Sequence, residues 1–421
     1  MELDAVVVGA GAAGLAAAIF TLRHDPLARI TVLEGARRPG AKILVSGGSR
    51  CNVTNRTVSE KDFNGGRPAA IRTILRALPV PATVSFFADL GVPLHEEPGG
   101  KLFPDSNRSR DVLDGLLNEL QRLGGTIRGE HRVTAVRASA GAFEVETSRG
   151  VLRARRVVLA TGGLSLPKSG SDGAGLGFAR ALGHTIVPTT PALAPLLLDG
   201  GASTSAAISG VATPVRLELE AHGRLVTRIS GAMLWTHFGI SGPAALDLSR
   251  HWLRIELAGI EPAVTASLQP DHSFDTLDAA WQALARRQPR ASLQTGLTTM
   301  LPASLAMLVL DRQRLPVSQI LADLTRDDRR ALVHTVLRWP LPITGSRGYS
   351  YAEATAGGVD LAEIDPSTME SRRCPELFLV GEMLDVDGRL GGFNFQWAWS
   401  SAMVAGRALA RRIAASRAGS H

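Results

Sequence analysis

The chain is poor in cysteine and aromatic residues, and each shortage narrows the kinds of protein it can be. Its 421 residues include two cysteines, which exclude a disulfide framework and fit a reducing, cytoplasmic setting. Aromatic residues make up 5%, which leaves few rings for stacking on single-stranded RNA bases. The sequence also lacks the Cys and His spacings of a metal site and the Gly-x-Ser-x-Gly elbow of serine hydrolases, so neither chemistry is expected.

Lysine is scarce, and the basic residues are almost all arginine. Only four of the 46 basic residues are lysine, and the formal net charge is +7. That charge suits a nucleic acid or an anionic substrate, although so strong a bias toward arginine also fits a compositional habit. Short basic groups, mostly at predicted helix ends or faces where solvation explains them, lie at 153–156, 286–290, 326–330 and 407–417. Structured RNA therefore stays open as a partner.

Length and hydropathy indicate a globular protein of more than one domain. A chain of 421 residues is long for a single hydrophobic core, and 45% apolar with 20% charged residues is ordinary for a globular protein. Residues 5–22 carry no charge and could pass for a membrane helix or signal peptide. Glu2 and Asp4 precede them instead of a basic region, so we expect neither a targeting segment nor a membrane partner.

Residues 5–34 follow the strand–turn–helix–strand order of a dinucleotide-binding unit. A β-branched run at 5–8 leads into a glycine-rich turn, and an Ala/Leu/Ile helix runs to Leu22. A second strand at 30–33 ends at Glu34. This order favours a nucleotide site over a chance cluster of glycines.

Each glycine of the turn has a separate mechanical task. Gly9 permits the tight turn, Gly11 lets backbone N–H groups approach a pyrophosphate, and Gly14 lets the helix pack closely on the strand. The diphosphate is then expected at a helix N-terminus, where free N–H groups and the helix dipole favour an anion. Glu34 lies twenty residues past Gly14, where a carboxylate can bind a ribose diol. An unphosphorylated ribose at that point suits FAD or NAD.

The segment after this unit is dense in small and hydrogen-bonding residues. It contains Lys42, which can neutralise phosphate, and then the run Ser46-Gly47-Gly48-Ser49-Arg50-Cys51-Asn52-Val53-Thr54-Asn55. We predict a ligand-contacting loop rather than a regular element, with Arg50 as a second phosphate-neutralising cation.

This run resembles the Ser-Gly-Gly-Gly-Arg-Cys-Asn-x-Thr-Asn signature of the YhiN/BaiN-type flavoproteins, a family of FAD-dependent oxidoreductases. Ser49 stands where the family has a third glycine. Further resemblance lies at 236–243, at 355–359 and most strongly at 381–401, so it spans nearly the whole chain. The segment 101–104 also resembles a family segment near the substrate side of the flavin, although alone it would pass as a turn.

The motifs and the resemblance together predict the residues that bind FAD. Late strand 377–380 ends at Gly381, which by resemblance runs beside the pyrophosphate and ribityl chain, and Glu382 and Asp385 are expected to accept hydrogen bonds from the ribityl hydroxyls. A helix from about 394 to 413 then presents its N-terminus to the isoalloxazine, with Gln396 and Trp397 either packing under the ring or touching it. The predicted cofactor-binding residues are Gly9, Gly11, Ala13, Gly14, Glu34, Lys42, Ser46, Gly47, Arg50, Asn52, Val133, Ala160, Thr161, Gly162, Gly163, Gly381, Glu382, Asp385, Gly391, Gly392, Phe393 and Asn394.

Two residues are candidates for catalysis, and each has a structural alternative. Cys51 could donate a proton or act as a redox partner near a flavin, but no Cys-x-x-Cys is present, so a tightly packed structural thiol is favoured. His237 could protonate a substrate carbon because a histidine titrates near neutrality, or it could be a hydrogen-bonded structural residue.

The predicted fold is α/β, with a Rossmann-like FAD-binding domain interrupted by an inserted β-rich and helical domain. Strand patterns at 215–220 and 254–257 and helical spacings from Leu277 to Leu284 and from Leu332 to Trp339 define the insert. The expected bounds are 1–190 for the first part of the cofactor domain, including a mainly helical excursion at about 68–125; 191–343 for the insert, β-rich at 191–262 and helical at 275–342; and 344–421 for the second part.

We interpret the chain as an FAD-dependent oxidoreductase that reduces a conjugated C=C–C=O group of a small molecule. NADH or NADPH is the expected electron donor, and it would bind transiently because no second dinucleotide fingerprint is present. The resemblance implies two substrate classes, bile-acid enones and uridine in ribosomal RNA. A flavin-carrying binding protein without turnover is the alternative from another class.

Overall fold

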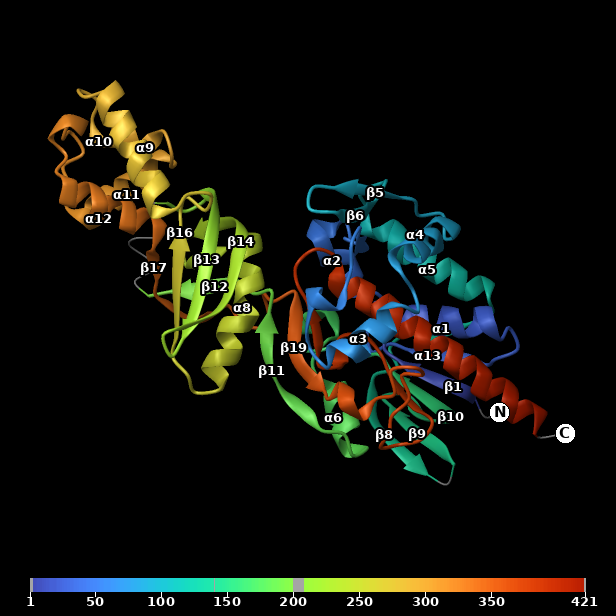
Figure 1. Ribbon diagram of the computed structural model, residues 1–421. Helices are drawn as coiled ribbons and strands as arrows, with labels where there is room; N and C mark the ends of the chain where they lie inside the picture. Colours follow the sequence, from blue (N-terminus) through green and yellow to red (C-terminus); the bar gives the residue numbers. More distant parts are fainter. Residues whose placement is uncertain (1–2, 140, 200–207, 420–421) are drawn as a thin grey trace. The chain divides into compact units, whose positions relative to one another are not determined.

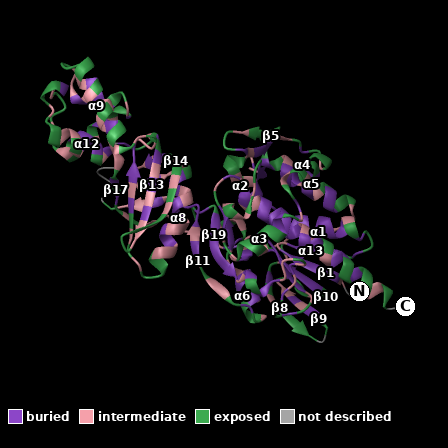
Figure 2. Cartoon of the chain, in the orientation of Figure 1, coloured by how far each residue is buried: buried purple, intermediate pink, exposed green. Residues whose placement is uncertain are grey.

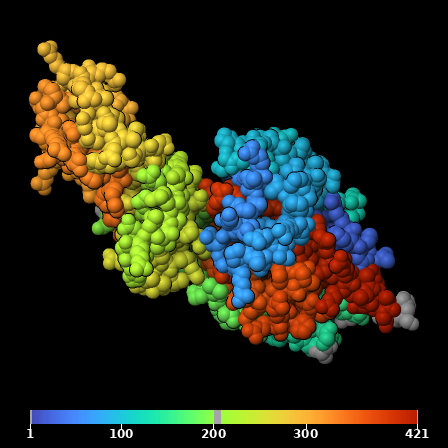
Figure 3. All heavy atoms as spheres, in the orientation of Figure 1, coloured from blue at the N-terminus to red at the C-terminus, as the bar shows by residue number. Residues whose placement is uncertain are grey.

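The computed structural model describes residues 3–139, 141–199 and 208–419, and the chain divides into two compact units. The first unit comprises Met1–Thr190 and Ala352–His421, and the second comprises Pro191–Tyr351. Segments from the two ends of the sequence, blue and red in Figure 3, share the surface of the first unit. The predicted insert begins at the same residue as the second unit and ends earlier, at 343.

A mostly parallel sheet forms the centre of the first unit. Its strands lie in the order β7-β2-β1-β10, and β20 pairs with β10 on the far side. These five strands pair in parallel and are rich in β-branched residues that suit a sheet buried on both faces. Their bounds are β1 Leu3–Val8, β2 Ile30–Leu33, β7 Thr126–Arg128, β10 Gly150–Leu159 and β20 Leu377–Leu379.

Strand β10 changes its neighbour partway along its length. Its first half pairs antiparallel with β9 (Ala142–Thr147), which pairs in turn with β8 (Val133–Ser139). Its second half pairs with β20, so the strand predicted at 377–380 lies in the same sheet as β1, and that prediction is confirmed. Because the parallel strands share one carboxyl edge, segments far apart in the sequence meet there.

Two helices pack against each other over this sheet, α1 (Ala12–His24) and α13 (Phe393–Ala418). Every α1 residue from 13 to 22 is buried, which explains why the uncharged segment is so apolar (Figure 2). A Cβ on Gly406 of α13 would lie 2.7 Å from Cβ of Phe20, so the helices approach as closely as a glycine allows (Figure 1). The predicted helix at 394–413 is thus one residue longer at its start and five longer at its end.

Smaller elements complete the first unit. A three-stranded sheet has the order β3-β6-β5, and two-stranded sheets join β4 to β21 and β11 to β19. Residues 101–104, which alone would pass as a turn, form strand β6 instead, since they pair on both sides. The bounds are α2 Ala41–Ser49, β3 Thr54–Asn55, β4 Phe63–Gly65, α3 Pro68–Leu75, α4 Val80–Asp89, β5 Leu94–Glu97, β6 Lys101–Pro104, α5 Ser109–Arg122, α6 Ala174–Ala181, β11 Ile186–Ala192, β19 Ala354–Val359 and β21 Val386–Gly388.

The stretch Pro68–Asp89 has the length and mean hydropathy, 1.2, of a helix able to cross a membrane. It consists of two helices, because Pro79 between them has extended backbone with ψ of 159°. This stretch packs against the core of the first unit, where its residues Ile71, Ile74 and Phe87 are buried.

The second unit combines a seven-stranded antiparallel sheet with helices. The sheet has the order β17-β16-β13-β14-β15-β12-β18, and α8 (Gly242–Leu257) packs on it. The other helices follow between β16 and β17. The remaining bounds are β12 Leu196–Leu198, β13 Ala212–Ala221, β14 Arg224–Thr236, β15 Gly239–Ser241, β16 Pro262–Ser267, α9 Phe274–Arg287, α10 Leu293–Thr298, α11 Ala303–Gln313, α12 Arg326–Leu337, β17 Trp339–Leu341 and β18 Ile343–Ser346.

Two predictions in the second unit are wrong. Residues 254–257 form the end of α8 rather than a strand, because Ala245, Ser249 and Leu253 repeat at helical spacing and bury one face. Trp339 belongs to β17 rather than to the preceding helix, since Ala266 of β16 pairs with it. The strand at 215–220 and the helices around Leu277 and Leu332 are present as predicted.

A buried polar cluster ties the start of β11 to the segment before β20. His184 Nδ1 lies 3.0 Å from Glu363 Oε2, and its Nε2 lies 2.8 Å from Ser371 Oγ. Burial lowers the pKa of His184, so the neutral ring donates from Nδ1 and accepts the serine proton at Nε2. Ser371 Oγ also accepts from the backbone N–H of Cys374 at 2.8 Å. The order Ser–His–Glu therefore serves packing here, because the serine oxygen is already engaged.

We expect Glu363→Gln to destabilise the protein by about 2–4 kcal/mol at pH 7, because Glu363 accepts from Thr185, Arg373 and His184. Burial alone would raise the pKa of Glu363, but these hydrogen bonds outweigh it and lower the value from 4.5 to about 2. A lowered pKa stabilises the folded state above about pH 4.5, and that stabilisation is lost as the pH falls toward 2.

Urea denaturation at several pH values measures this effect. The difference between wild type and Glu363→Gln should shrink from pH 5 to pH 3, whereas Glu261→Gln, at an exposed position, should track wild type throughout. A stability difference that stays constant from pH 5 to pH 3 would show that ionisation of Glu363 does not stabilise the folded protein.

Candidate functional site

The glycine turn at the carboxyl end of β1 packs its first and third glycines against the protein and leaves space at the second, Gly11. A Cβ on Gly9, whose φ is +106°, would lie 2.5 Å from the carbonyl oxygen of Ala160. A Cβ on Gly14 would lie 1.9 Å from the carbonyl oxygen of Gly9. Apart from Gly11 itself and its two chain neighbours, no described residue has an atom within 4 Å of a Cβ built on Gly11. The first and third glycines are therefore required by packing, and the space at Gly11 is free for a ligand.

Helix α1 begins beside that open space without a side-chain cap. Gly11 occupies its N-cap position, where no side-chain hydrogen bond is made. The first N–H groups of a helix have no partner inside the helix, so they are available to an anion. The uncapped helix start favours an anion such as a pyrophosphate, and the open space at Gly11 leaves room for it in this cradle.

Glu34 is fixed by the backbone around the same turn. Its Oε2 accepts from the N–H of Ala10 at 3.1 Å, and its Oε1 accepts from the N–H of Ala36 at 2.9 Å. The carbonyl oxygen of Glu34 accepts from the N–H of His131, two residues before Val133 at the start of β8. The half-buried carboxylate is thus held at the end of β2 with lone pairs left for a ribose hydroxyl.

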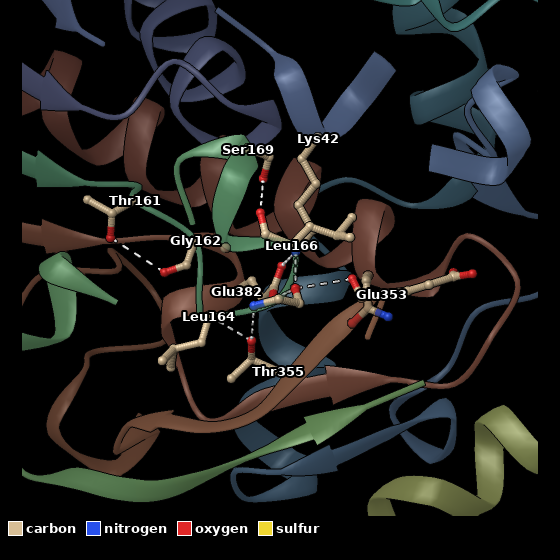
Figure 4. Close-up of polar contacts among 12 residues, drawn as sticks. Lys42, Thr161, Gly162, Leu164, Leu166, Ser169, Glu353, Thr355 and Glu382 are labelled. Atoms are coloured by element: carbon tan, nitrogen blue, oxygen red, sulfur yellow. Dashed lines mark hydrogen bonds and ion pairs between the residues drawn. The ribbon is translucent and has the colours of Figure 1, made fainter. Parts of the chain in front are cut away.

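Three segments meet in an ion pair at the carboxyl edge of the sheet (Figure 4). The ammonium group of Lys42 contacts both Ser165 Oγ and Glu382 Oε2, and Ser165 Oγ lies 2.8 Å from Glu382 Oε1. Thr355 supports this cluster, because its Oγ1 accepts from the N–H groups of Leu164 and Ser165 at 2.8 and 3.1 Å. Lys42 is therefore already neutralised by Glu382. Its contact with phosphate stays a prediction.

Sequence reasoning missed Ser165 and Thr355. Ser165 lies two residues after the predicted segment 161–163, and Thr355 is the first residue of the segment 355–359 that resembles the family, but neither was predicted as a site residue. The glycines around these two hydroxyl groups are closely packed. A Cβ on Gly163 would lie 2.4 Å from Thr355 Oγ1. Likewise a Cβ on Gly175 would lie 1.9 Å from Thr161 Oγ1, so the loop after β10 is closely packed.

The end of β20 meets the start of α1. Gly381 has φ of +76°, and its added Cβ would lie 2.7 Å from Cβ of Ala13. Its N–H donates to Ser401 Oγ of α13 at 3.1 Å. Asp385 follows, with its N–H donating to the carbonyl oxygen of Val359 at 2.8 Å. The structure thus brings together the predicted positions at 9–14, 160–163 and 381–382.

The start of α13 lies against the loop at 51–55. Gly392, at the N-cap of α13, has φ of +93°, and its added Cβ would lie 2.5 Å from the carbonyl oxygen of Thr54. Asn55 Nδ2 donates to the carbonyl oxygen of Gly391 at 3.0 Å. Asn394 Oδ1 accepts from the N–H of Gly388 at 2.8 Å, and Asn394 Nδ2 donates to the carbonyl oxygen of Gly388 at 2.9 Å. Asn394 therefore shapes the turn from which the helix starts.

Asn52 differs from these asparagines because its side-chain oxygen has no partner. Asn52 Oδ1 is buried and makes no hydrogen bond within residues 3–139, 141–199 and 208–419. It would lie 2.8 Å from a Cβ added at Gly392, so the orphan acceptor sits at the N-terminus of α13. A buried acceptor costs free energy unless a donor reaches it. A flavin ring with its N–H group supplies such a donor.

Gln396 and the two neighbouring tryptophans pack the helix in place. Gln396 accepts from Thr54 Oγ1 at 2.6 Å and donates to the carbonyl oxygen of Leu78 at 2.7 Å, and it is buried. The indole N–H of Trp397 donates to the carbonyl oxygen of Gly381, and that of Trp399 to the carbonyl oxygen of Val53. These partners favour the packing alternative for Gln396 and Trp397.

The loop expected at 46–55 is only partly irregular. Helix α2 runs into it and is interrupted at 46–48. Ser49, in place of the family's glycine, keeps the left-handed backbone with φ of +66°, close to the +67° of Gly48. The backbone at Ser49 therefore has the left-handed conformation that a glycine adopts readily, although serine stands there.

Arg50 and Cys51 lie beside this break. The Arg50 guanidinium pairs with Glu97 at 2.6 Å and covers the ring of Phe103 at 4.2 Å. Its role toward phosphate stays a prediction. Burial raises the pKa of the Cys51 thiol to about 12. A thiol so rarely ionised favours the structural alternative for Cys51 over nucleophilic or redox chemistry.

His237 lies in the second unit, in the turn between β14 and β15. It is exposed, and its ring meets that of Phe238 edge-on at 5.1 Å. The guanidinium of Arg347 covers Phe238 at 4.5 Å and Tyr351 at 3.4 Å. The general-acid role of His237 stays a prediction. Among the residues described, no group of three or more His, Cys, Asp or Glu is arranged to hold a metal.

Comparison with known proteins agrees with this site. The family described as "HI0933-like protein Rossmann domain" matches residues 3–408. The chain is 35% identical to the 3-dehydro-bile acid delta(4,6)-reductase of Clostridium scindens over 96% of this chain and 98% of that protein. It is 33% identical to the ribosomal RNA dihydrouridine synthase of Escherichia coli over 95% of this chain and 96% of that protein.

A solved structure shares the fold at low sequence identity. The FrdA subunit of Escherichia coli quinol fumarate reductase superposes with a TM-score of 0.53 at 17% identity, over 99% of this chain and 71% of that one. The resemblance found in the sequence is confirmed, and at the level of class the chain is an FAD-dependent oxidoreductase. The chain belongs to the HI0933-like protein family of Rossmann-fold flavoproteins.

Proposed function

We propose that this protein reduces the C=C bond of a conjugated carbonyl compound with electrons from NADH or NADPH, and that the substrate is a small molecule. The observation that carries the proposal is the 35% identity to a bile-acid reductase over nearly the whole of both chains. The bound FAD supplies hydride transfer to and from its N5 atom. The protein supplies binding, orientation and electrostatics.

The residues of the first unit divide these tasks. The start of α1 at Gly11 holds the pyrophosphate, and Glu34 accepts from the ribose. Asn52 Oδ1 accepts from the flavin ring, because it is the buried acceptor that the protein leaves unpaired at α13. The N-terminus of α13, capped only by Gly392, favours negative charge on the pyrimidine side of the ring.

A ribosomal RNA substrate is the second candidate. Two relatives bear the name ribosomal RNA dihydrouridine synthase, from Escherichia coli at 33% and Haemophilus influenzae at 31% identity. Uridine reduction also adds hydride to the β carbon of a conjugated carbonyl, so the same flavin site suits both substrates. The excess of arginine favours RNA, while the spread of basic groups along the chain and the few aromatics favour a small molecule.

We expect Gly11→Val to weaken FAD binding by at least about tenfold while the apo protein stays folded. The added Cβ has no atom within 4 Å apart from its chain neighbours, and the side chain would fill the space beside the α1 N-terminus. Its φ of −86° is open to any residue. Flavin content after purification and a thermal melt of the apo protein measure the two effects. Gly177→Val, at an exposed position of α6 where an added Cβ also has open space, should keep its FAD. Full FAD content in Gly11→Val would rule out this cradle.

The reaction is tested with purified, FAD-loaded protein under anaerobic conditions. NADH or NADPH should bleach the flavin absorption, and a conjugated 3-oxo steroid or bile acid should restore it. Gly11→Val provides the inactive control.

Two outcomes would contradict the small-molecule proposal. If deletion of the gene removes a dihydrouridine from ribosomal RNA and the intact gene restores it, RNA is the substrate. If neither nicotinamide donor bleaches the flavin, the protein carries a flavin without this turnover.

A further inference from the structure

A polar hollow lies where β10 exchanges one neighbour for another. The register with β9 ends at Ala154, and the register with β20 begins at Val157. Between them the two neighbouring strands separate and leave a hollow of about 450 Å³, within the roughly 300–1,000 Å³ of ligand sites. Its lining is Gly141, Ala142, Arg153, Arg155, Arg156, Glu376 and Ser416. We call it the fork site.

The fork site lies away from the cofactor edge of the sheet. Arg155 precedes Thr161 by six residues of extended chain, roughly 20 Å at about 3.3 Å per residue. The end of α13 covers this part of β10, since Arg156 bonds to Arg412 and Ser416 (Figure 1). The flavin cradle and the fork site are therefore separate places on the first unit.

Arg156 is a positioned donor with unused capacity. Its side chain is 5% exposed, and its Nε lies 2.5 Å from Glu376 Oε2. Its NH2 donates to Ser416 Oγ at 2.7 Å and to the carbonyl oxygen of Arg412 at 3.2 Å. Its NH1 is buried and has no hydrogen-bond partner in the part of the chain that the structure describes. The guanidinium is thus held in place on two nitrogens while the third lacks an acceptor.

The charge balance of the lining favours an anion. Three arginines face one acid, Glu376, whose carboxylate already pairs with Arg156. Arg153 and Arg155 are exposed on β10, and Arg153 lies directly across from Glu144 of β9. Guanidinium groups match the oxygens of a phosphate in pairs, and Ser416 lies beside them.

We propose that the fork site binds a phosphate group, carried by a small phosphate ester or by an RNA backbone. The proposal goes beyond the reductase function and does not depend on it. Phosphate suits the site better than a single carboxylate, because three arginines line one hollow and a dianion is balanced by more than one of them.

Calorimetric titration of the FAD-loaded protein with inorganic phosphate, at fixed ionic strength, tests the proposal. The double variant Arg153→Gln/Arg155→Gln should bind phosphate at least about tenfold more weakly than wild type. The control Arg286→Gln/Arg287→Gln removes the same charge from exposed positions at the end of α9 and should bind like wild type. Arg156→Lys, which keeps the charge but loses NH1, should also weaken binding if a thermal melt shows it folded.

Uridine monophosphate and a short oligouridine identify the source of the phosphate. If the oligouridine competes with phosphate and loses affinity in the Arg153→Gln/Arg155→Gln variant, the site takes an RNA backbone. If only uridine monophosphate competes with phosphate and loses affinity in that variant, the fork site takes a small phosphate ester. Absence of saturable phosphate binding to wild type, or equal affinity in the fork-site and control variants, would overturn the proposal. Flavin content and NADPH oxidation are read separately, so failure of the reductase function is distinguishable.

Discussion

The close approach of three backbone segments at the carboxyl end of β1 is the constraint on which the rest of the site depends. Gly14 leaves no room for a side chain against the carbonyl oxygen of Gly9, and Gly9 leaves none against that of Ala160. Helix α1 can therefore start directly above the junction of β1 and β10. Because β20 pairs with the other side of β10, Gly381 reaches the same place from the far end of the sequence. An insert of some 160 residues is accommodated without moving this junction.

Around this junction the protein satisfies most of its own polar groups and leaves a few open. Lys42 and Glu382 neutralise each other and both contact Ser165, and Asn394 hydrogen-bonds to the backbone of Gly388. The groups left open are the start of α1 at Gly11 and the buried oxygen of Asn52. An anion is favoured at the first, and a hydrogen-bond donor at the second. A flavin adenine dinucleotide carries both kinds of group, a pyrophosphate in its middle and an N–H on its flavin ring.

The sequence predicted those features that depend on local backbone demands. The glycine turn, the buried strands and the apolar α1 follow from residues whose size or branching leaves one suitable conformation. Short patterns were less reliable, because four alternating residues at 254–257 fit the end of a helix as well as a strand. Trp339 continued a helical spacing by chance and instead pairs in a sheet.

The side-chain partners of the site were not predictable from local sequence. Nothing near Lys42 indicates that Glu382, more than three hundred residues later, neutralises it. Thr355 and Ser165 carry common hydroxyl groups, and only the fold shows that they hold the ion pair together. The unpaired oxygen of Asn52 is likewise a property of the folded neighbourhood, since Asn55 three residues later is fully engaged.

An experimentally determined structure with FAD bound tests the central claim most directly. The account predicts the pyrophosphate at the α1 N-terminus beside Gly11 and a hydrogen bond from the flavin ring to Asn52 Oδ1, with the Lys42–Glu382 pair intact. A cofactor whose pyrophosphate lies elsewhere, or whose ring leaves Asn52 Oδ1 unpaired, would contradict it.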